Sequence, residues 1–219
     1  LLWTSPALTA DVRSVVVGSG ALAYVKAGRY VYGLNKDFGT VTWTFDLGAL
    51  GVAKGPGAPA LTDGGAPAVF VGSGDGYAYK IDANTGLQVC KSPVKLGTDL
   101  SKASPLIGAD GTVYFVDDTA AVDRLIAVNP GDCSQRWAVN LGAGAGTSSP
   151  TYWANPATAD TNDDLIFVGA DKLYAFTIWG GLKWSVSLKT APEVTTTVPS
   201  TPLVIDPGGT WKVYAVNNV

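Results

Sequence analysis

The side chains of this sequence that could carry chemistry are mostly carboxylates. Asp117 and Asp118 are adjacent, and paired carboxylates can perform general acid–base catalysis when one of them is shielded from water. Further along the chain, Asp160, Asn162 and Asp164 place three oxygen-bearing side chains in one short turn. Hard cations such as calcium prefer several oxygen ligands close together. The sequence therefore presents one candidate site for proton transfer and one for calcium.

Both candidates also have a simpler explanation. The segment from Asp160 to Asp164 follows the Asp-x-Asn-x-Asp start of calcium loops, but it lacks the glycine and the later acidic residue that complete them. Asp and Asn are common in tight turns, because their side chains accept hydrogen bonds from the nearby backbone. No buried partner is recognisable for Asp117 or Asp118. A calcium site and an ordinary turn both stay open, and we expect no catalytic residue and no other cofactor in this chain.

Composition excludes several classes of site. The chain has 219 residues with no His and no Met, and Glu193 is its single Glu. Triads that depend on His, His-ligated metals and paired-glutamate glycosidase sites are therefore excluded within these residues. The 15 basic residues are scattered along the chain and the net charge is −3, so we expect no nucleic-acid partner. No apolar run reaches the roughly 18 residues of a membrane-spanning helix.

Short apolar runs separated by turns predict an all-β fold. Hydrophobic residues make up 47% of the chain, and 27 Gly and 13 Pro divide them. A small residue followed by proline recurs along the chain, and it indicates first strands, because proline cannot donate to a strand ladder. These small residues are Ser5, Ala58, Ser104, Ser149 and Thr201. The β-branched and aromatic runs that follow predict buried second strands at 15–17, 69–71, 113–116, 166–168 and 213–216.

A repeat of constant length divides the chain into similar units. Glycine-bearing turns are followed by Trp43, Cys90, Trp137 and Trp184, and these positions are 47 residues apart. Such a repeat, built from short strands, is typical of a β-propeller, in which each blade is a four-stranded antiparallel sheet. We predict one propeller segment with four complete blades and the first two strands of a fifth. The expected blades are approximately 1–48, 49–97, 98–142, 143–190 and, in part, 191–219.

Two strands of a fifth blade cannot close a ring, and open sheet edges tend to associate. The sequence also has neither an initiator Met nor a signal peptide. We therefore expect further blades, supplied by a longer gene product or by a partner chain.

The stretch from Lys80 to Cys90 resembles the tryptophan-docking motif of quinoprotein-type, PQQ-like propeller repeats, roughly Ala-x-Asp-x-x-x-Gly-x-x-x-Trp. The stretches 33–43, 127–137 and 175–184 match this motif in part. Members of that family form rings of seven or eight blades, in which the Trp of one blade stacks on the Gly of the next. The resemblance assigns five residues to such contacts between blades: Trp43, Gly86, Trp137, Gly180 and Trp184.

The two cysteines fall on this motif. Cys90 stands where the motif has its Trp in the second blade, and Cys133 stands where it has its Gly in the third. Docking would join these two positions, so the resemblance implies a disulfide between them and folding in an oxidising compartment. Two buried free thiols are the alternative.

The family includes quinone-dependent dehydrogenases as well as cofactor-free scaffolds, so the fold alone does not decide the function. The dehydrogenases have a vicinal disulfide, which cysteines at positions 90 and 133 cannot form. We therefore expect an extracytoplasmic scaffold (periplasmic, at the cell surface or secreted) that binds protein partners or copies of itself. One alternative is a segment of a PQQ-dependent dehydrogenase whose catalytic blades lie outside this chain. Another is glycan binding through exposed aromatic side chains such as Trp179.

Partner contacts are expected on loops, because a rigid scaffold usually presents its binding residues there. The region from Ala21 to Arg29 is expected to be a long loop of the first blade that offers Tyr24, Lys26 and Arg29 to a partner. Asp117 and Asp118 are expected in the corresponding loop of the third blade.

Overall fold

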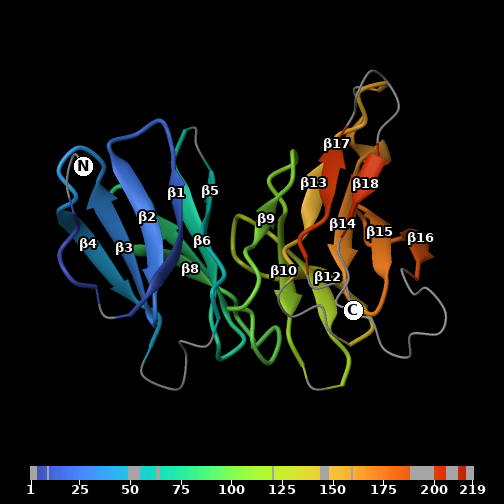
Figure 1. Cartoon of the computed structure of the whole chain (residues 1–219), viewed down its shortest axis with the longest axis horizontal. Helices are drawn as coiled ribbons and strands as arrows, with labels where there is room; N and C mark the ends of the chain where they lie inside the picture. The colour runs from blue at the N-terminus through green and yellow to red at the C-terminus, as the bar shows by residue number, and fades with distance from the viewer. Residues whose placement is uncertain are drawn as a thin grey trace.

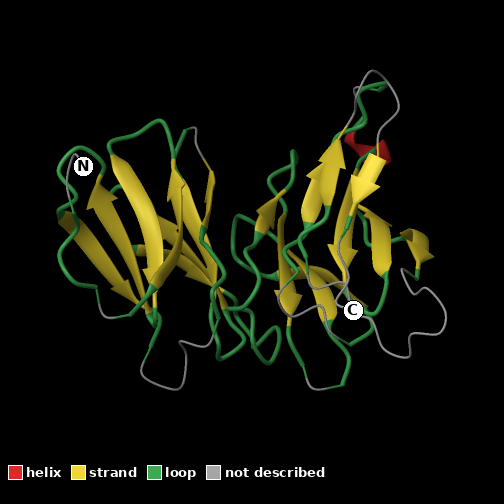
Figure 2. Cartoon of the chain, in the orientation of Figure 1, coloured by secondary structure: helices red, strands yellow, loops and turns green. Residues whose placement is uncertain are grey.

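The computed structural model of the chain describes residues 4–8, 10–48, 55–62, 65–119, 121–143, 148–158, 160–187, 200–205 and 212–215. Strands joined by turns make up almost all of this part (Figure 2). Its one helix is a short 3-10 turn, Thr161–Asp163. Within these residues no helix has the length and hydrophobicity needed to cross a membrane.

Antiparallel sheets follow one another along the chain (Figure 1). The first contains β1 (Val12–Val17), β2 (Leu22–Ala27), β3 (Tyr30–Asn35) and β4 (Val41–Asp46). The second contains β5 (Ala60–Thr62), β6 (Ala68–Gly72), β7 (Ala78–Asp82) and β8 (Gln88–Lys91). The third contains β9 (Leu106–Ile107), β10 (Val113–Asp117), β11 (Arg124–Val128) and β12 (Gln135–Asn140). The fourth contains β13 (Thr151–Trp153), β14 (Leu165–Gly169), β15 (Leu173–Thr177) and β16 (Leu182–Val186).

A fifth, two-stranded sheet contains β17 (Leu203–Ile205) and β18 (Lys212–Tyr214). In every sheet, strands that are consecutive in the sequence are hydrogen-bonded neighbours. Each four-stranded sheet is therefore a meander, which is the form of a propeller blade. The all-β class and the four-stranded antiparallel blades are as the sequence predicts.

The core lies between neighbouring blades. Second strands supply much of it, because consecutive side chains of a strand point to opposite faces and each face meets another blade. Tyr114 of β10 packs toward the fourth sheet with Ile166, whereas the next residue, Phe115, packs toward the second sheet with Phe70. This burial on both faces explains why the second strands are apolar at most positions.

First strands contact one another along the inner edge of the row of blades. β5, β9, β13 and β17 each begin directly after a proline, as the sequence indicates. Hydroxyl groups join these segments: the Ala58 amide donates to Ser104 Oγ (2.8 Å), and the Ser104 amide donates to Ser149 Oγ (2.9 Å). Thr151 Oγ1 continues the series by donating to the Pro202 carbonyl (2.6 Å). The serine before a proline therefore ties one blade to the next.

The first sheet corrects the predicted layout of the first blade. The region from Ala21 to Arg29 is not a loop, because β2 lies within it and all six of its residues are buried. Tyr24 and Lys26 are only 4% and 8% exposed, so neither is available to a partner. The valines at 15–17 belong to the first strand, β1, and not to the second.

The physical reason is a turn that the sequence analysis missed. Gly28 has a positive φ of 61°, and with Arg29 it joins β2 directly to β3. β2 then precedes Trp43 at nearly the same spacing as β6 precedes Cys90. Counting back from the docking position would have identified β2 as the second strand.

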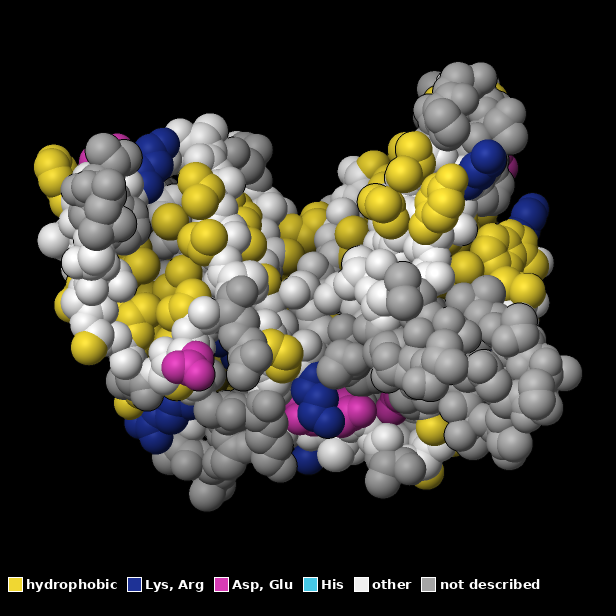
Figure 3. All heavy atoms as spheres, viewed as in Figure 1, with side chains coloured by type: hydrophobic (Ala, Val, Ile, Leu, Met, Phe, Trp, Pro, Cys, Tyr) yellow, Lys and Arg dark blue, Asp and Glu magenta, His cyan; other side chains and the backbone are white. Residues whose placement is uncertain are grey.

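Two apolar faces lie at the ends of the row of blades. β1 presents Val12, Val15 and Val17 on the face it shares with Val25 and Ala27 of β2. The second face is on β17 and β18, where Leu203, Ile205 and Tyr214 lie on one side. These six exposed side chains are between 42% and 57% accessible to solvent. Figure 3 shows hydrophobic side chains gathered over the first sheet and over β17 and β18.

Candidate functional site

One end of the blades carries many of the charged side chains, and we call it the connection end. It consists of the turns between second and third strands together with the segments that lead from one blade to the next. Backbone bonds hold these together, from the Leu47 amide to the Arg29 carbonyl (3.0 Å) and from the Leu141 amide to the Asp123 carbonyl (2.8 Å). Acidic and basic side chains gather at this end below β10 (Figure 3). Four predicted site residues lie here: Lys26, Arg29, Asp117 and Asp118.

Asp117 is a structural carboxylate. It is fully buried and accepts hydrogen bonds from the backbone amides of Thr98 (2.6 Å) and Asp99 (3.1 Å). Its other oxygen accepts from Arg124 through Nε (3.2 Å) and Nη2 (2.7 Å). A glycine is required next to it, because a Cβ on Gly97 would lie 2.4 Å from the carboxylate. Asp117 thus fixes the segment between β8 and β9, and its contacts differ from those of a general base.

Lys26 ties the first blade to two later segments. Its Nζ donates to the Gly55 carbonyl (3.2 Å) and to the Ser101 carbonyl (3.1 Å). Burial lowers the pKa of Lys26 to about 8, and the Asp99 carboxylate opposes part of this decrease. Asp99 is itself buried and accepts from the Ser101 amide (2.9 Å) and hydroxyl (2.5 Å). Lys26 is therefore an internal contact and does not face a partner.

Two ion pairs at the connection end remain partly exposed. Lys102 donates to Asp118, and this hydrogen bond raises the pKa of the Lys102 ammonium. Arg29 Nη2 donates to Asp46 Oδ2 at 2.6 Å, next to the β2–β3 turn. A partner that approaches this end would meet these charges.

The sequence analysis missed three charged members of this network: Asp99, Lys102 and Arg124. They lie on the segment between β8 and β9 and at the start of β11, and none of them recurs in other blades. A repeat-based analysis has no signal for such single contacts. The serines before the prolines, in contrast, do recur, and the sequence marks them as strand starts, although not as contacts between blades.

The three candidate calcium ligands are each engaged by a different partner. Asp160 Oδ1 accepts from the Asn162 amide (2.9 Å) and from its side chain (2.6 Å). Asn162 Oδ1 accepts from Trp179 Nε1 (2.9 Å), and the buried Asp164 accepts from Tyr152. No group of three His, Cys, Asp or Glu side chains that could hold a metal ion occurs in the described part of the chain. These contacts fit a turn that Asp160 caps.

The predicted docking residues meet as pairs between blades. Gly86 has a φ of 73°, and a Cβ added to it would lie 2.6 Å from the Trp43 ring. Gly180 has a φ of 84°, and its added Cβ would lie 2.9 Å from the Trp137 ring. Both indoles also donate to a backbone carbonyl of the next blade, at 3.0 Å in each case. Trp184 instead packs with apolar residues of the fourth and fifth sheets.

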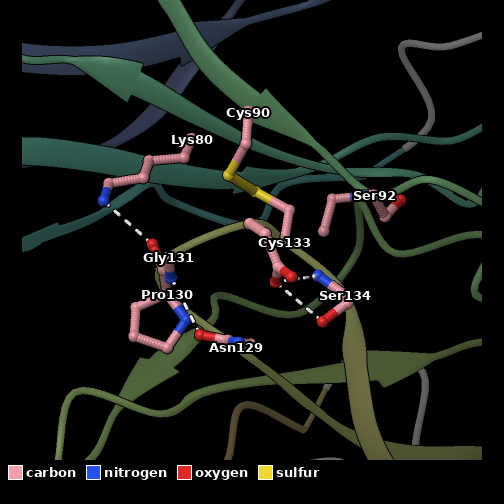
Figure 4. The surroundings of a disulfide bond; sticks show 10 residues. Lys80, Cys90, Ser92, Asn129, Pro130, Gly131, Cys133 and Ser134 are labelled. Atoms are coloured by element: carbon pink, nitrogen blue, oxygen red, sulfur yellow. Dashed lines mark hydrogen bonds between the residues drawn. A yellow bond between two sulfur atoms is a disulfide. The ribbon is translucent and has the colours of Figure 1, made fainter.

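Cys90 and Cys133 form a disulfide between the second and third blades, with their Cα atoms 5.9 Å apart (Figure 4). The predicted bond is confirmed. Cys133 has a φ of 61° and is the non-glycine residue with positive φ in the described part of the chain. It keeps the backbone shape of the motif glycine, so the disulfide takes the place of a Trp–Gly contact. Next to it, Lys80 Nζ donates to the Pro130 carbonyl (2.9 Å).

With this geometry established, the sequence can be compared with known families. Residues 27–219 match the family model described as outer membrane protein assembly factor BamB. The chain belongs to this family. None of the curated proteins matches the sequence.

Solved structures show the same propeller fold. BamB from Moraxella catarrhalis aligns with a TM-score of 0.66 and 16% identity over 93% of this chain and 57% of its own. A quinohemoprotein alcohol dehydrogenase from Pseudomonas putida HK5 aligns with a TM-score of 0.69 and 16% identity over 99% of this chain and 40% of its own. A europium-containing methanol dehydrogenase aligns with a TM-score of 0.70 and 13% identity over 94% of this chain and 48% of its own. The BamB-like chain thus spans 40% to 57% of the length of these proteins.

Proposed function

We propose that this BamB-like chain is a non-catalytic scaffold that binds a protein partner in an extracytoplasmic compartment. The observation that carries the proposal is the pairing of charges at the connection end. The Asp117 carboxylate already accepts hydrogen bonds from backbone amides and from Arg124, and the Lys26 ammonium already donates to backbone carbonyls. Ion pairs such as Lys102–Asp118 then offer a rigid polar surface rather than converging acids and bases.

The disulfide between Cys90 and Cys133 supports an extracytoplasmic location. Disulfides persist where the surroundings are oxidising and are rare in the cytosol of most organisms. The membership of the BamB family, described as an outer membrane protein assembly factor, agrees with this placement.

The structural likeness to quinoprotein dehydrogenases favours a second candidate, a segment of a PQQ-dependent dehydrogenase. The described residues do not fit a quinone with its calcium ion. The oxygens of Asp160, Asn162 and Asp164 are engaged elsewhere, and the two cysteines bond to each other across 43 residues of sequence. Binding of calcium alone would require that turn to rearrange. Titration of the purified protein with PQQ and calcium, followed by quinone absorbance, tests this candidate.

The scaffold proposal is tested by crosslinking from one end of the blades. Val122 is 43% exposed in the loop between β10 and β11, and Leu87 is 69% exposed in the turn between β7 and β8 at the opposite end. A benzoylphenylalanine at Val122 should capture one defined extracytoplasmic protein, and the same group at Leu87 should not. The captured protein is then purified and its binding measured directly.

The Lys102–Asp118 pair provides the matched variants. Lys102→Glu should weaken binding of the purified partner roughly tenfold by placing two acids together at the interface. The exchange Lys102→Asp with Asp118→Lys keeps the internal pair and controls for stability. Capture of the same protein from both positions, or unchanged binding by Lys102→Glu, would contradict the proposal. Saturable binding of PQQ would favour the dehydrogenase candidate.

A further inference from the structure

The fourth blade has an insertion between its first two strands, β13 and β14, and this insertion contacts the turn between β15 and β16. β13 ends at Trp153 and β14 begins at Leu165, whereas β9 ends at Ile107 and β10 begins at Val113. The extra residues lie at the end of the blades opposite to the connection end, where Figure 2 shows the 3-10 helix. From this helix, Asn162 Oδ1 accepts a hydrogen bond from Trp179 Nε1 in the turn between β15 and β16 (2.9 Å).

Trp179 is held in place and yet exposed. Its side chain is 64% accessible to solvent, although the indole N–H already has a partner. Asn162 is itself fixed by two bonds to Asp160 Oδ1. The turn below is rigid, because Gly180 rests on the ring of Trp137. Ordering a large apolar side chain at the surface gives the fold little, so this arrangement indicates a contact with a ligand.

Two acidic residues flank, in the sequence, the short segment from which Asn162 contacts this indole. Asp160 and Asp163 are both exposed, and backbone and side-chain hydrogen bonds from Asn162 lower the pKa of Asp160. Asp163 pairs with no basic side chain among the described residues. Leu182, which is 57% exposed, adds apolar surface just after the turn.

We propose that Trp179, Asp160 and Asp163 form a docking site for an arginine-bearing segment of a protein partner. The proposal rests on the scaffold function and names the chemistry of a second contact. The guanidinium of an arginine can stack on an indole face and donate hydrogen bonds to more than one carboxylate. The apolar stem of the same side chain can pack on Leu182. Trp and Arg are also the residue types that most often dominate protein interfaces.

Two other occupants fit less well. A neutral sugar would use the apolar face of Trp179 but would not use the charge of the two carboxylates. A lysine ammonium would use the charge, but as a compact hydrated ion it stacks less well than a planar guanidinium. The site therefore predicts an order of preference: arginine, then lysine, then neutral saccharide.

The first blade provides a matched control. Phe38 is 71% exposed in the turn between β3 and β4, the same place in its blade, but no long insertion lies over it. Phe38→Ala therefore removes an exposed aromatic side chain without touching the acidic insertion. Asp163→Asn removes one charge from the insertion and leaves the backbone hydrogen bond from the Asp163 amide to the Asp160 carbonyl in place.

The experiment measures binding of a short synthetic peptide of alternating Arg and Gly, and of its Lys, Glu and uncharged Gln counterparts, at low and at physiological salt. The Arg peptide should bind more tightly than the Lys peptide. Trp179→Ala should weaken the Arg peptide roughly two- to fivefold, as expected for an exposed cation–π contact. Asp163→Asn should weaken it to a similar extent, and Phe38→Ala should leave it unchanged. Near-ultraviolet circular dichroism and thermal melts confirm that each variant is folded.

Equal effects of Trp179→Ala and Phe38→Ala, or no effect of either, would overturn the proposal. So would tighter Trp179-dependent binding of a neutral hexasaccharide such as cellohexaose, which would make the site a glycan contact. The crosslinking partner at Val122 lies at the other end of the blades, so failure here leaves that result untouched. Failure of both experiments would count against the scaffold function itself.

Discussion

At the scale of single residues, the buried ammonium of Lys26 gives the protein a measurable pH dependence. Burial lowers the pKa of Lys26 from 10.5 to about 8 in the folded chain. Between these two values the unfolded chain binds more protons, so the free energy of unfolding rises with pH. Below pH 8 both states are protonated, and the cost of burying the charge is present in full. A shift of this size corresponds to about 3 kcal/mol at 1.36 kcal/mol per unit.

Lys26→Met removes this dependence. The unfolding free energy of the unmodified protein, minus that of the variant, should increase by about 2 kcal/mol between pH 7 and pH 10. Urea titrations at several pH values measure it, and Lys183→Met, which removes an exposed lysine, should give a flat difference. A difference that falls with pH would show that Lys26 is stabilised as an ammonium by its carbonyl partners.

Gly86 provides a second residue-scale prediction, because two constraints act on it at once. Its φ is 73°, and a Cβ would enter the ring of Trp43. Gly111 has a similar φ of 80°, but its added Cβ would come no closer than 3.6 Å to Pro130. Gly86→Ala should lower the unfolding free energy by about 3 kcal/mol and Gly111→Ala by about 1 kcal/mol. Equal losses in urea titrations would mean that the indole does not rest on Gly86.

The sequence predicted single residues well only where they repeat. The docking tryptophans and glycines recur in most blades, so their spacing marks them. Asp117 does not recur, and its type alone suggested a loop acid open to chemistry. Its actual role depends on Arg124 and on two amides of the segment between β8 and β9. Such contacts between distant segments are set by the packing of blades, and no local pattern contains them.

At the scale of elements, the disulfide is a substitute for docking between two blades. Replacing both Cys90 and Cys133 by Ser should cost about 2–4 kcal/mol of unfolding free energy, the usual value for a loop of this length. Replacing them instead by Trp and Gly restores the motif of the other blades. Cys90→Trp with Cys133→Gly should then recover part of the loss even with reductant present, since Gly also relieves the positive φ at position 133.

Two measurements check this prediction. Urea titrations compare the two double variants with the unmodified protein in oxidising and reducing buffer. Intact mass after alkylation under denaturing conditions tests the bond itself, and two labels without reductant would contradict it. A Trp–Gly variant no more stable than the Ser variant would mean that the third blade cannot accept the docked ring.

The strands themselves were predictable in blades where a proline precedes them in the sequence and the docking position follows them. In the second to fourth blades, the predicted second strands fall within β6, β10 and β14. In the first blade the pattern failed, because Pro6 and the valines at 15–17 imitate the start of the second blade. β2 was missed because its alanines and Lys26 make it less apolar than the other second strands. Lys26 is accommodated in a strand that is buried on both faces because its ammonium has two carbonyl partners.

At the scale of the whole molecule, neighbouring blades are joined both at their inner edge and at their outer turns. Hydroxyl contacts tie the first strands, and the docking pairs and the disulfide tie the outer turns. Apolar side chains fill the space between these two lines of contacts. A row of blades held in this way is stiff. The connection end and the opposite end of the blades therefore present their side chains to partners in fixed positions.

The apolar faces at either side of the row predict how residues 1–219 behave when made as an isolated polypeptide. Each face presents three side chains that are 42% to 57% exposed, and every other blade face in the described part packs against a neighbour. Burying such surface is favourable by about 25 cal/mol per Å², so copies should associate through these faces. Sedimentation velocity should show oligomers that grow with concentration. Val17→Lys with Leu203→Lys should reduce them, because each adds a charge to one face, whereas Val122→Lys at the connection end should not. A sharply melting monomer at all concentrations would show that the two faces are satisfied within one copy.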